Sequence, residues 1–234
     1  MIGIIIQLAL SWLLIWFFES GNLSVLGMWP TRKRLIDFTL FFFVTAVCCA
    51  SGFFLKMLIA KQQWQINPHF DLHVIANGTW FNIKSVLFEE LIFRGVLLYV
   101  LIKNLGATKA ILISAVAFGI YHWFSHELFG NPKAMVIEFI VTGAMGVVLA
   151  YGYAKTWSLF IPIAIHLGWC MVQQVVFSDG PIGQQLFVEI MSRPIITVSY
   201  FSFFFMPLFP LVSTLMINYL LIWKRMKTID ISLS

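Results

Sequence analysis

Residues 79–103 read TWFNIKSVLFEELIFRGVLLYVLIK, a mostly apolar run that is long enough to cross a bilayer as one helix. Two carboxylates, Glu89 and Glu90, and the guanidinium of Arg94 lie midway along this run. A charged side chain near the centre of a bilayer costs about 2.5 to 3.5 kcal/mol on insertion scales, so these residues need partners inside the protein. The segment therefore predicts a helix that packs within a membrane-embedded bundle.

The whole chain has the composition of a membrane protein, because 60% of its 234 residues are hydrophobic and 11% are charged. A soluble protein of this length could not cover its surface with so few polar side chains. We expect one membrane-embedded domain over residues 1–234, an all-α polytopic bundle of about seven to eight transmembrane helices. The expected spans are residues 2–18, 36–59, 79–103, 108–128, 134–154, 157–177 and 196–223.

The last span has two readings, because Pro207 and Pro210 lie within it. It is either one span, or a broken helix or re-entrant turn preceded by an eighth short helix around Ile182 to Met191. The sequence leaves both readings open.

The net charge of +5 is best explained by membrane topology. If the spans alternate, nine basic residues lie on one side of the membrane: Arg32, Lys33, Arg34, Lys103, Lys109, Lys155, Lys224, Arg225 and Lys227. The other side receives Lys61, Lys133 and Arg193. The positive-inside rule then predicts a plasma (inner) membrane protein with its amino terminus outside and its carboxyl terminus in the cytoplasm. The basic charge is thus attributed to orientation, and no nucleic-acid partner is expected.

The two adjacent glutamates have different expected roles. Glu90 and Arg94 are four residues apart, so they share a helix face and can form an ion pair. Glu89 projects about 100° away around the helix and is left without that partner. A carboxylate of this kind in an apolar setting is a candidate general base.

Two intramembrane histidines complete a candidate site, namely His122 and His166. Either one alone is more often a hydrogen-bonded structural residue, but with Glu89 they form a set suited to hydrolysis. In one arrangement Glu89 and His122 activate water, while His166 stabilises the oxyanion. In the other, all three bind zinc and leave its fourth position to water. Spacing does not choose between these arrangements, so zinc is a possible cofactor.

Three short motifs resemble the CPBP family of intramembrane proteases, the CaaX-protease and bacteriocin-processing group also called the Abi family. The first is E-E-x-x-x-R at residues 89–94, the second F-x-x-x-H from Phe118 to His122, and the third begins at His166. The resemblance covers residues 79–177 and implies a catalytic core of four helices. It also implies that Glu89 activates water with His122, that Glu90 and Arg94 shape the site, and that His166 helps to hold the oxyanion.

Cys170 departs from the motif, because the prenyl-protein endopeptidases of this family have an asparagine at that place. A thiol is a poor hydrogen-bond donor, so we expect catalysis to persist with His166 alone and without a role for the thiol. The resemblance implies an intramembrane endopeptidase whose substrate is a hydrophobic, prenylated or leader-peptide-bearing protein at the lipid surface. The alternatives are a non-catalytic immunity or scaffold protein and, less favoured, a transporter or a haem-binding membrane protein.

Overall fold

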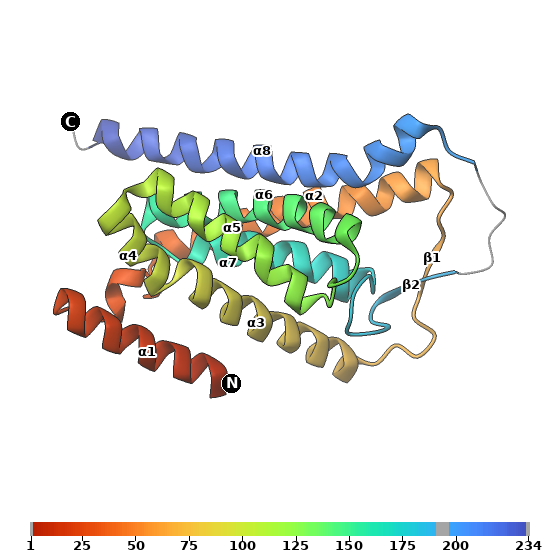
Figure 1. Ribbon diagram of the computed structural model, residues 1–234. Helices are drawn as coiled ribbons and strands as arrows, with labels where there is room; N and C mark the ends of the chain where they lie inside the picture. The colour runs from red at the N-terminus through yellow and green to blue at the C-terminus, as the bar shows by residue number, and fades with distance from the viewer. Residues whose placement is uncertain (1, 191–196, 233–234) are drawn as a thin grey trace.

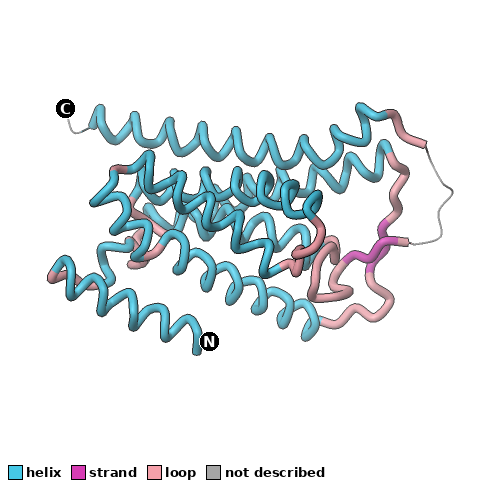
Figure 2. The backbone as a smooth tube through the Cα atoms, viewed as in Figure 1, coloured by secondary structure: helices cyan, strands magenta, loops and turns pink. Residues whose placement is uncertain are grey.

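The computed structural model describes residues 2–190 and 197–232, and helices make up most of this part of the chain (Figures 1 and 2). The α-helices are α1 (Ile2–Glu19), α2 (Arg32–Ile59), α3 (Leu72–Arg94), α4 (Val96–Leu105), α5 (Ala107–Ser125), α6 (Pro132–Thr156), α7 (Phe160–Cys170) and α8 (Tyr200–Ser232). A 3-10 turn at Leu23–Leu26 precedes α2, and a π-helical turn at Met171–Val176 extends α7. The expected all-α bundle is confirmed.

Four helices among the described residues are long and apolar enough to cross a membrane. They are α2, α5, α6 and residues 200–225 of α8, while α1 and the α7 region are shorter apolar helices. Large apolar side chains such as Phe43, Ile140 and Phe201 are exposed on their outer faces, as lipid-facing side chains are. The chain is therefore an integral membrane protein.

The expected continuous span over residues 79–103 is wrong, because the helix breaks at Gly95. Helix α3 begins earlier, at Leu72, where the Asp71 side chain accepts a hydrogen bond from the backbone N–H of His73. It ends at Arg94, and α4 starts at Val96 in a new direction (Figure 1). A Cβ at Gly95 would collide with the Leu91 carbonyl oxygen, so the bend requires glycine.

The alternative of an eighth short helix around Ile182 to Met191 is also wrong over the described residues 182–190. This stretch contains strand β2 (Phe187–Glu189), which pairs antiparallel with β1 (Trp64–Ile66) and joins the α2–α3 connection to the segment after α7 (Figure 2). Asn67 N–H donates to the Leu186 carbonyl at 2.9 Å, so this backbone finds its partners across the ribbon rather than within a helix. Met191 and Arg193 lie outside the described residues.

Helix α8 runs through both of its prolines without a break. The Pro210 ring packs against α2 at Gly52, where an added Cβ would lie 2.7 Å from the proline Cγ. The Pro210 carbonyl accepts a hydrogen bond from Ser213 Oγ at 3.1 Å. Proline lacks the backbone N–H of other residues, and close packing against a neighbouring helix makes it tolerable inside this helix.

The helices alternate in direction along the bundle, which sets where the basic residues lie. The start of α2, the α4–α5 turn, the α6–α7 turn and the carboxyl-terminal end of α8 share one end (Figure 1). At that end the rings of Tyr99 and Trp157 pack together with their centroids 5.7 Å apart. The Ser158 hydroxyl donates a hydrogen bond to the Gly27 carbonyl oxygen. This alternation is the premise on which the predicted orientation in the membrane depends.

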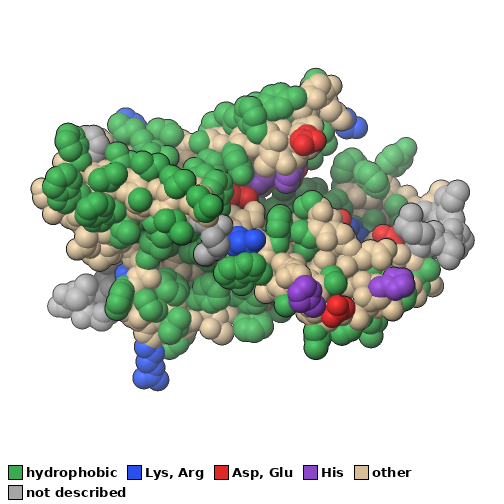
Figure 3. All heavy atoms as spheres, turned by 90° about the horizontal axis from the view of Figure 1, so that it is seen from below, with side chains coloured by type: hydrophobic (Ala, Val, Ile, Leu, Met, Phe, Trp, Pro, Cys, Tyr) green, Lys and Arg blue, Asp and Glu red, His purple; other side chains and the backbone are tan. Residues whose placement is uncertain are grey.

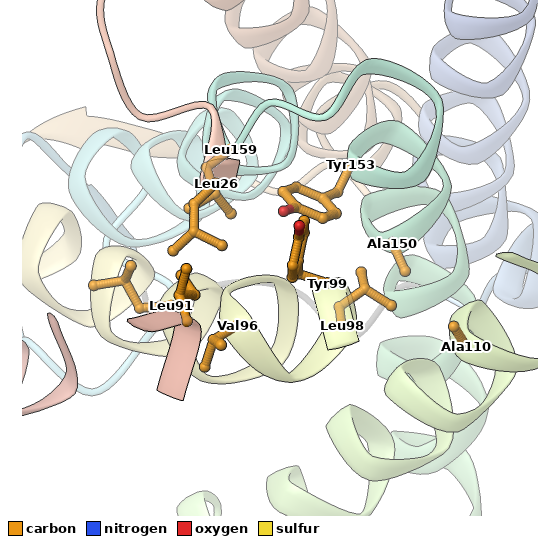
Figure 4. Packing of buried hydrophobic residues seen from close by; sticks show 10 residues of the cluster. Leu26, Leu91, Val96, Leu98, Tyr99, Ala110, Ala150, Tyr153 and Leu159 are labelled. Atoms are coloured by element: carbon orange, nitrogen blue, oxygen red, sulfur yellow. The ribbon is translucent and has the colours of Figure 1, made fainter. Parts of the chain in front are cut away.

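An apolar cluster fixes the bend between α3 and α4. Leu91 and Val96 flank the bend and pack with Leu26 and Leu159, and the Tyr99 and Tyr153 hydroxyls point toward one another (Figure 4). All six of these side chains are at most 6% exposed. The carboxyl-terminal part of α3, which carries the two glutamates, is thereby held firmly against α6 and α7.

Candidate active site

Glu89 lies on α3, nearly two turns before the bend at Gly95, and its two carboxylate oxygens have different surroundings. Oε1 accepts a hydrogen bond of 3.3 Å from Ser85 Oγ, one turn earlier on the same helix. Oε2 is buried and has no hydrogen-bond partner among the described protein atoms. This oxygen is therefore available for chemistry.

His122 comes from the last turns of α5 and is buried. Its Nδ1 lies 2.8 Å from the Phe118 carbonyl oxygen, which can only accept, so Nδ1 carries the proton. Nε2 then points inward and lies 4.0 Å from Glu89 Oε2. The Phe118 ring packs edge-on against the imidazole, with centroids 4.5 Å apart, and helps to fix its orientation.

His166 comes from α7 and reaches both glutamates of α3. Its Nδ1 is 2.7 Å from Glu90 Oε1, and its Nε2 is 3.8 Å from Glu89 Oε2. Both histidines thus present Nε2 to the same carboxylate oxygen. These distances from Nε2 to Oε2, 3.8 and 4.0 Å, are longer than a direct hydrogen bond. They leave room for a water-sized group that contacts all three side chains.

Glu90 and Arg94 form the ion pair that their spacing predicts, with Arg94 Nη1 3.1 Å from Glu90 Oε1. Both side chains are fully buried. The guanidinium also donates to the Gly146 carbonyl at 3.4 Å and lies over the Phe118 ring at 4.1 Å. The sequence does not predict the contact of Glu90 with His166, because the two residues are far apart in the chain and no local spacing signals it.

Glycines bring the helices of the site close together. An added Cβ at Gly146 of α6 would lie 3.1 Å from Ala115 Cα of α5. At Gly168 of α7 it would lie 2.6 Å from the Phe42 carbonyl oxygen of α2. Small residues at helix crossings allow this close approach, and side chains from three helices can then meet.

Cys170 lies one turn after His166 on α7, is partly buried, and interacts with the His166 side chain. Among the described residues, no group of three His, Cys, Asp or Glu side chains is arranged so that it could hold a metal ion. This finding gives no support to the zinc arrangement of Glu89, His122 and His166, which stays a prediction for experiment.

A second histidine and carboxylate pair lies at the rim of the site. His126, which follows α5, has its Nδ1 3.1 Å from Glu138 Oε1 of α6, and its ring is 5.2 Å from that of His122. The hydrogen bond to Glu138 raises the pKa of His126 above its ordinary value. Seen from below, histidine and acidic side chains gather in a hollow of the surface (Figure 3).

The family model described as type II CAAX prenyl endopeptidase, Rce1-like, matches residues 35–172. This range contains Glu89, His122 and His166. No curated protein and no solved structure matches the chain.

Proposed function

The chain belongs to the Rce1-like family of type II CAAX prenyl endopeptidases, and on this premise we propose that Glu89, His122 and His166 carry out its peptide-bond hydrolysis. The family supports an intramembrane endopeptidase in general. The residues and the substrate are our proposal. The observation that carries it is the buried, unpartnered Glu89 Oε2 facing Nε2 of both histidines.

In the proposed reaction, water lies between Glu89 and the two imidazoles. Glu89 takes a proton from the water, and the neutral Nε2 of His122 lies beside it. As the proton leaves, the water oxygen bonds to the carbonyl carbon of the substrate. The carbon–nitrogen bond then breaks, and the same proton passes to the leaving amine. A water-poor site strengthens each of these interactions relative to bulk solvent.

His166 is proposed to stabilise the oxyanion through Nε2–H. Because its Nδ1 donates to Glu90, a proton on Nε2 makes the ring a cation, and the Glu90 carboxylate at 2.7 Å balances that charge. Arg94 keeps Glu90 in place from the other side. Glu90 and Arg94 therefore act by positioning, and Cys170 has no chemical role in this scheme.

We further propose residues 79–177 as the catalytic core. The substrate would be a membrane-associated protein or peptide, such as a prenylated CAAX protein or a leader-peptide-bearing precursor. Such substrates share an apolar portion that partitions into lipid and brings the scissile bond to a site at membrane depth. The amino terminus would lie outside and the carboxyl terminus in the cytoplasm.

The test uses the purified full chain in lipid nanodiscs. A pool of synthetic peptides, with and without a prenylated carboxyl-terminal cysteine box, is incubated with the protein, and products are identified by mass spectrometry. We expect defined cleavage products that are absent with the Glu89→Gln variant and present with Glu127→Gln, an exposed control. Identical products from the wild type and Glu89→Gln would overturn the assignment.

The same preparation separates the two hydrolytic arrangements. Elemental analysis of active protein, together with treatment by a chelator, tests for zinc. Full activity after chelation, with metal far below one equivalent, supports direct glutamate catalysis. One equivalent of zinc, with activity lost on chelation and restored on adding zinc back, supports the metal arrangement.

A further inference from the structure

Lys84 is a cation on α3 whose charge the hydrolytic scheme does not use. Its Nζ lies 6.0 Å from the centroid of the Trp80 ring, so the side chain extends toward the start of α3 and away from Glu89. Among the described residues, no carboxylate lies within ion-pair distance of Lys84. An unpaired ammonium on a helix of a membrane bundle indicates a function for that charge.

Lys84 borders a cavity of about 330 Å³ between α1 and α3. The lining residues are Gly3, Ile4, Phe81, Lys84, Ser85 and Phe88. Most of this lining is apolar, whereas Lys84 and Ser85 are polar. Ser85 Oγ also donates to Glu89 Oε1, so the cavity directly adjoins the carboxylate of the candidate site. Figure 3 shows a basic side chain on the same face as the hollow that holds the acidic and histidine side chains.

We propose that this cavity is a substrate subsite in which Lys84 binds a carboxylate of the peptide, an inference that rests on the proposed function. An ammonium recognises a carboxylate as a point charge with three donors, and partial burial strengthens that attraction. The apolar lining accepts the uncharged part of the peptide beside the carboxylate. Lys84 is thus a specificity-determining residue and takes no part in the bond cleavage.

The helix geometry sets a minimum distance between this carboxylate and the cleaved bond. Helical side chains lean toward the amino terminus, so the Glu89 carboxylate lies level with Ser85 and the Lys84 ammonium near Trp80. Five residues of helix span about 7.5 Å at 1.5 Å per residue. Five residues also rotate by about 140° around the helix, so the two charges lie farther apart than this rise, and an extended peptide at about 3.3 to 3.6 Å per residue needs at least three residues to bridge them.

Such a carboxylate has two sources, the free carboxyl terminus of the peptide or an internal aspartate. Both are tested by binding to the Glu89→Gln protein in nanodiscs, where peptides are retained without cleavage. Short apolar peptides are offered in three matched sets: with a free carboxyl terminus, with a carboxyl-terminal amide, and with an amide plus one internal aspartate. Mass spectrometry then quantifies what is retained.

We expect about a tenfold to hundredfold enrichment of one or both carboxylate-bearing sets over the plain amides, as for a charge-assisted contact. The set that is enriched identifies the source of the carboxylate. Adding Lys84→Met should abolish the enrichment, and Lys84→Arg should restore most of it. Lys133→Met, which removes an exposed cation at the start of α6, should leave it unchanged.

Equal retention of all three sets would overturn the proposal. A loss in Lys84→Met that affects all sets alike, and that appears only with anionic phospholipid in the nanodisc, would assign Lys84 to a lipid headgroup and would also overturn it. Failure of the hydrolytic assignment has a separate signature, since it appears as unchanged cleavage by Glu89→Gln in the peptide assay. The two outcomes are therefore distinguishable.

Discussion

Nδ1 of His166 lies 2.7 Å from Oε1 of Glu90, and this contact directs the opposite nitrogen of the ring toward Glu89. Adjacent residues on a helix project about 100° apart. Glu90 can therefore orient the imidazole through Nδ1, while Glu89 faces its second nitrogen, Nε2. Orientation of an imidazole through Nδ1 by a carboxylate is a common way to fix its tautomer. The two adjacent glutamates thus have separate structural roles, because Glu90 orients His166 and Glu89 faces the site.

Glu90→Gln should destabilise the protein by about 3 to 5 kcal/mol, because it leaves Arg94 as a buried charge without its counter-ion. The free energy of unfolding in detergent, with Glu127→Gln as an exposed control, measures this loss. The double variant Glu90→Met with Arg94→Met should lose less than Glu90→Gln alone, since it leaves no unpaired charge. Equal unfolding free energies for Glu90→Gln and the wild type would contradict the buried pair.

Gly95→Ala should cost about 1 to 3 kcal/mol, because the new methyl group would collide with the Leu91 carbonyl oxygen at the bend. The matched control is Gly143→Ala in α6, where an added Cβ would meet only the Ala115 carbonyl oxygen at 3.8 Å. Thermal unfolding of the two variants side by side tests the difference. Similar midpoints would show that the bend does not depend on glycine.

The sequence predicts those features of the fold that depend on local pattern. Apolar runs predict the helical bundle, and the spacing of Glu90 and Arg94 predicts their ion pair. The break at Gly95 escapes prediction because a single glycine between two apolar runs resembles a continuous helix. The contact between Glu90 and His166 and the pairing of Trp64 with Glu189 depend on packing between distant segments, which no local spacing records.

The contact between His126 and Glu138 should stabilise the protein in a pH-dependent way. Folding raises the pKa of His126 through this hydrogen bond, so its contribution is complete below the unfolded pKa and fades as the pH rises through the folded value. The melting temperature of the wild type should exceed that of Glu138→Gln most at about pH 6 and least at about pH 8.5.

His126→Gln supplies the control for this pH dependence. In the His126→Gln background, the effect of Glu138→Gln on the melting temperature should be the same at every pH in that range. A pH-dependent effect that survives removal of His126 would assign the titration to another group.

Cys170→Ala should keep cleavage activity of the same order as the wild type, since the proposed chemistry uses no thiol. Initial rates on one cleaved peptide, measured before and after alkylation of the wild type, check this expectation. The alkylation result is less specific than the Cys170→Ala result, because the alkyl group also adds volume beside His166. Loss of activity in Cys170→Ala, with unfolding unchanged, would give the thiol a role in the reaction.

The central claim is that Glu89 activates the attacking water, and the turnover number of Glu89→Gln tests it most directly. With a peptide cleaved by the wild type in nanodiscs, kcat and KM are measured for the wild type, Glu89→Gln and Glu127→Gln. Loss of a general base predicts a fall in kcat of about 10² to 10⁴ for Glu89→Gln with KM little changed, while Glu127→Gln behaves as the wild type. A kcat for Glu89→Gln equal to that of the wild type would contradict the account.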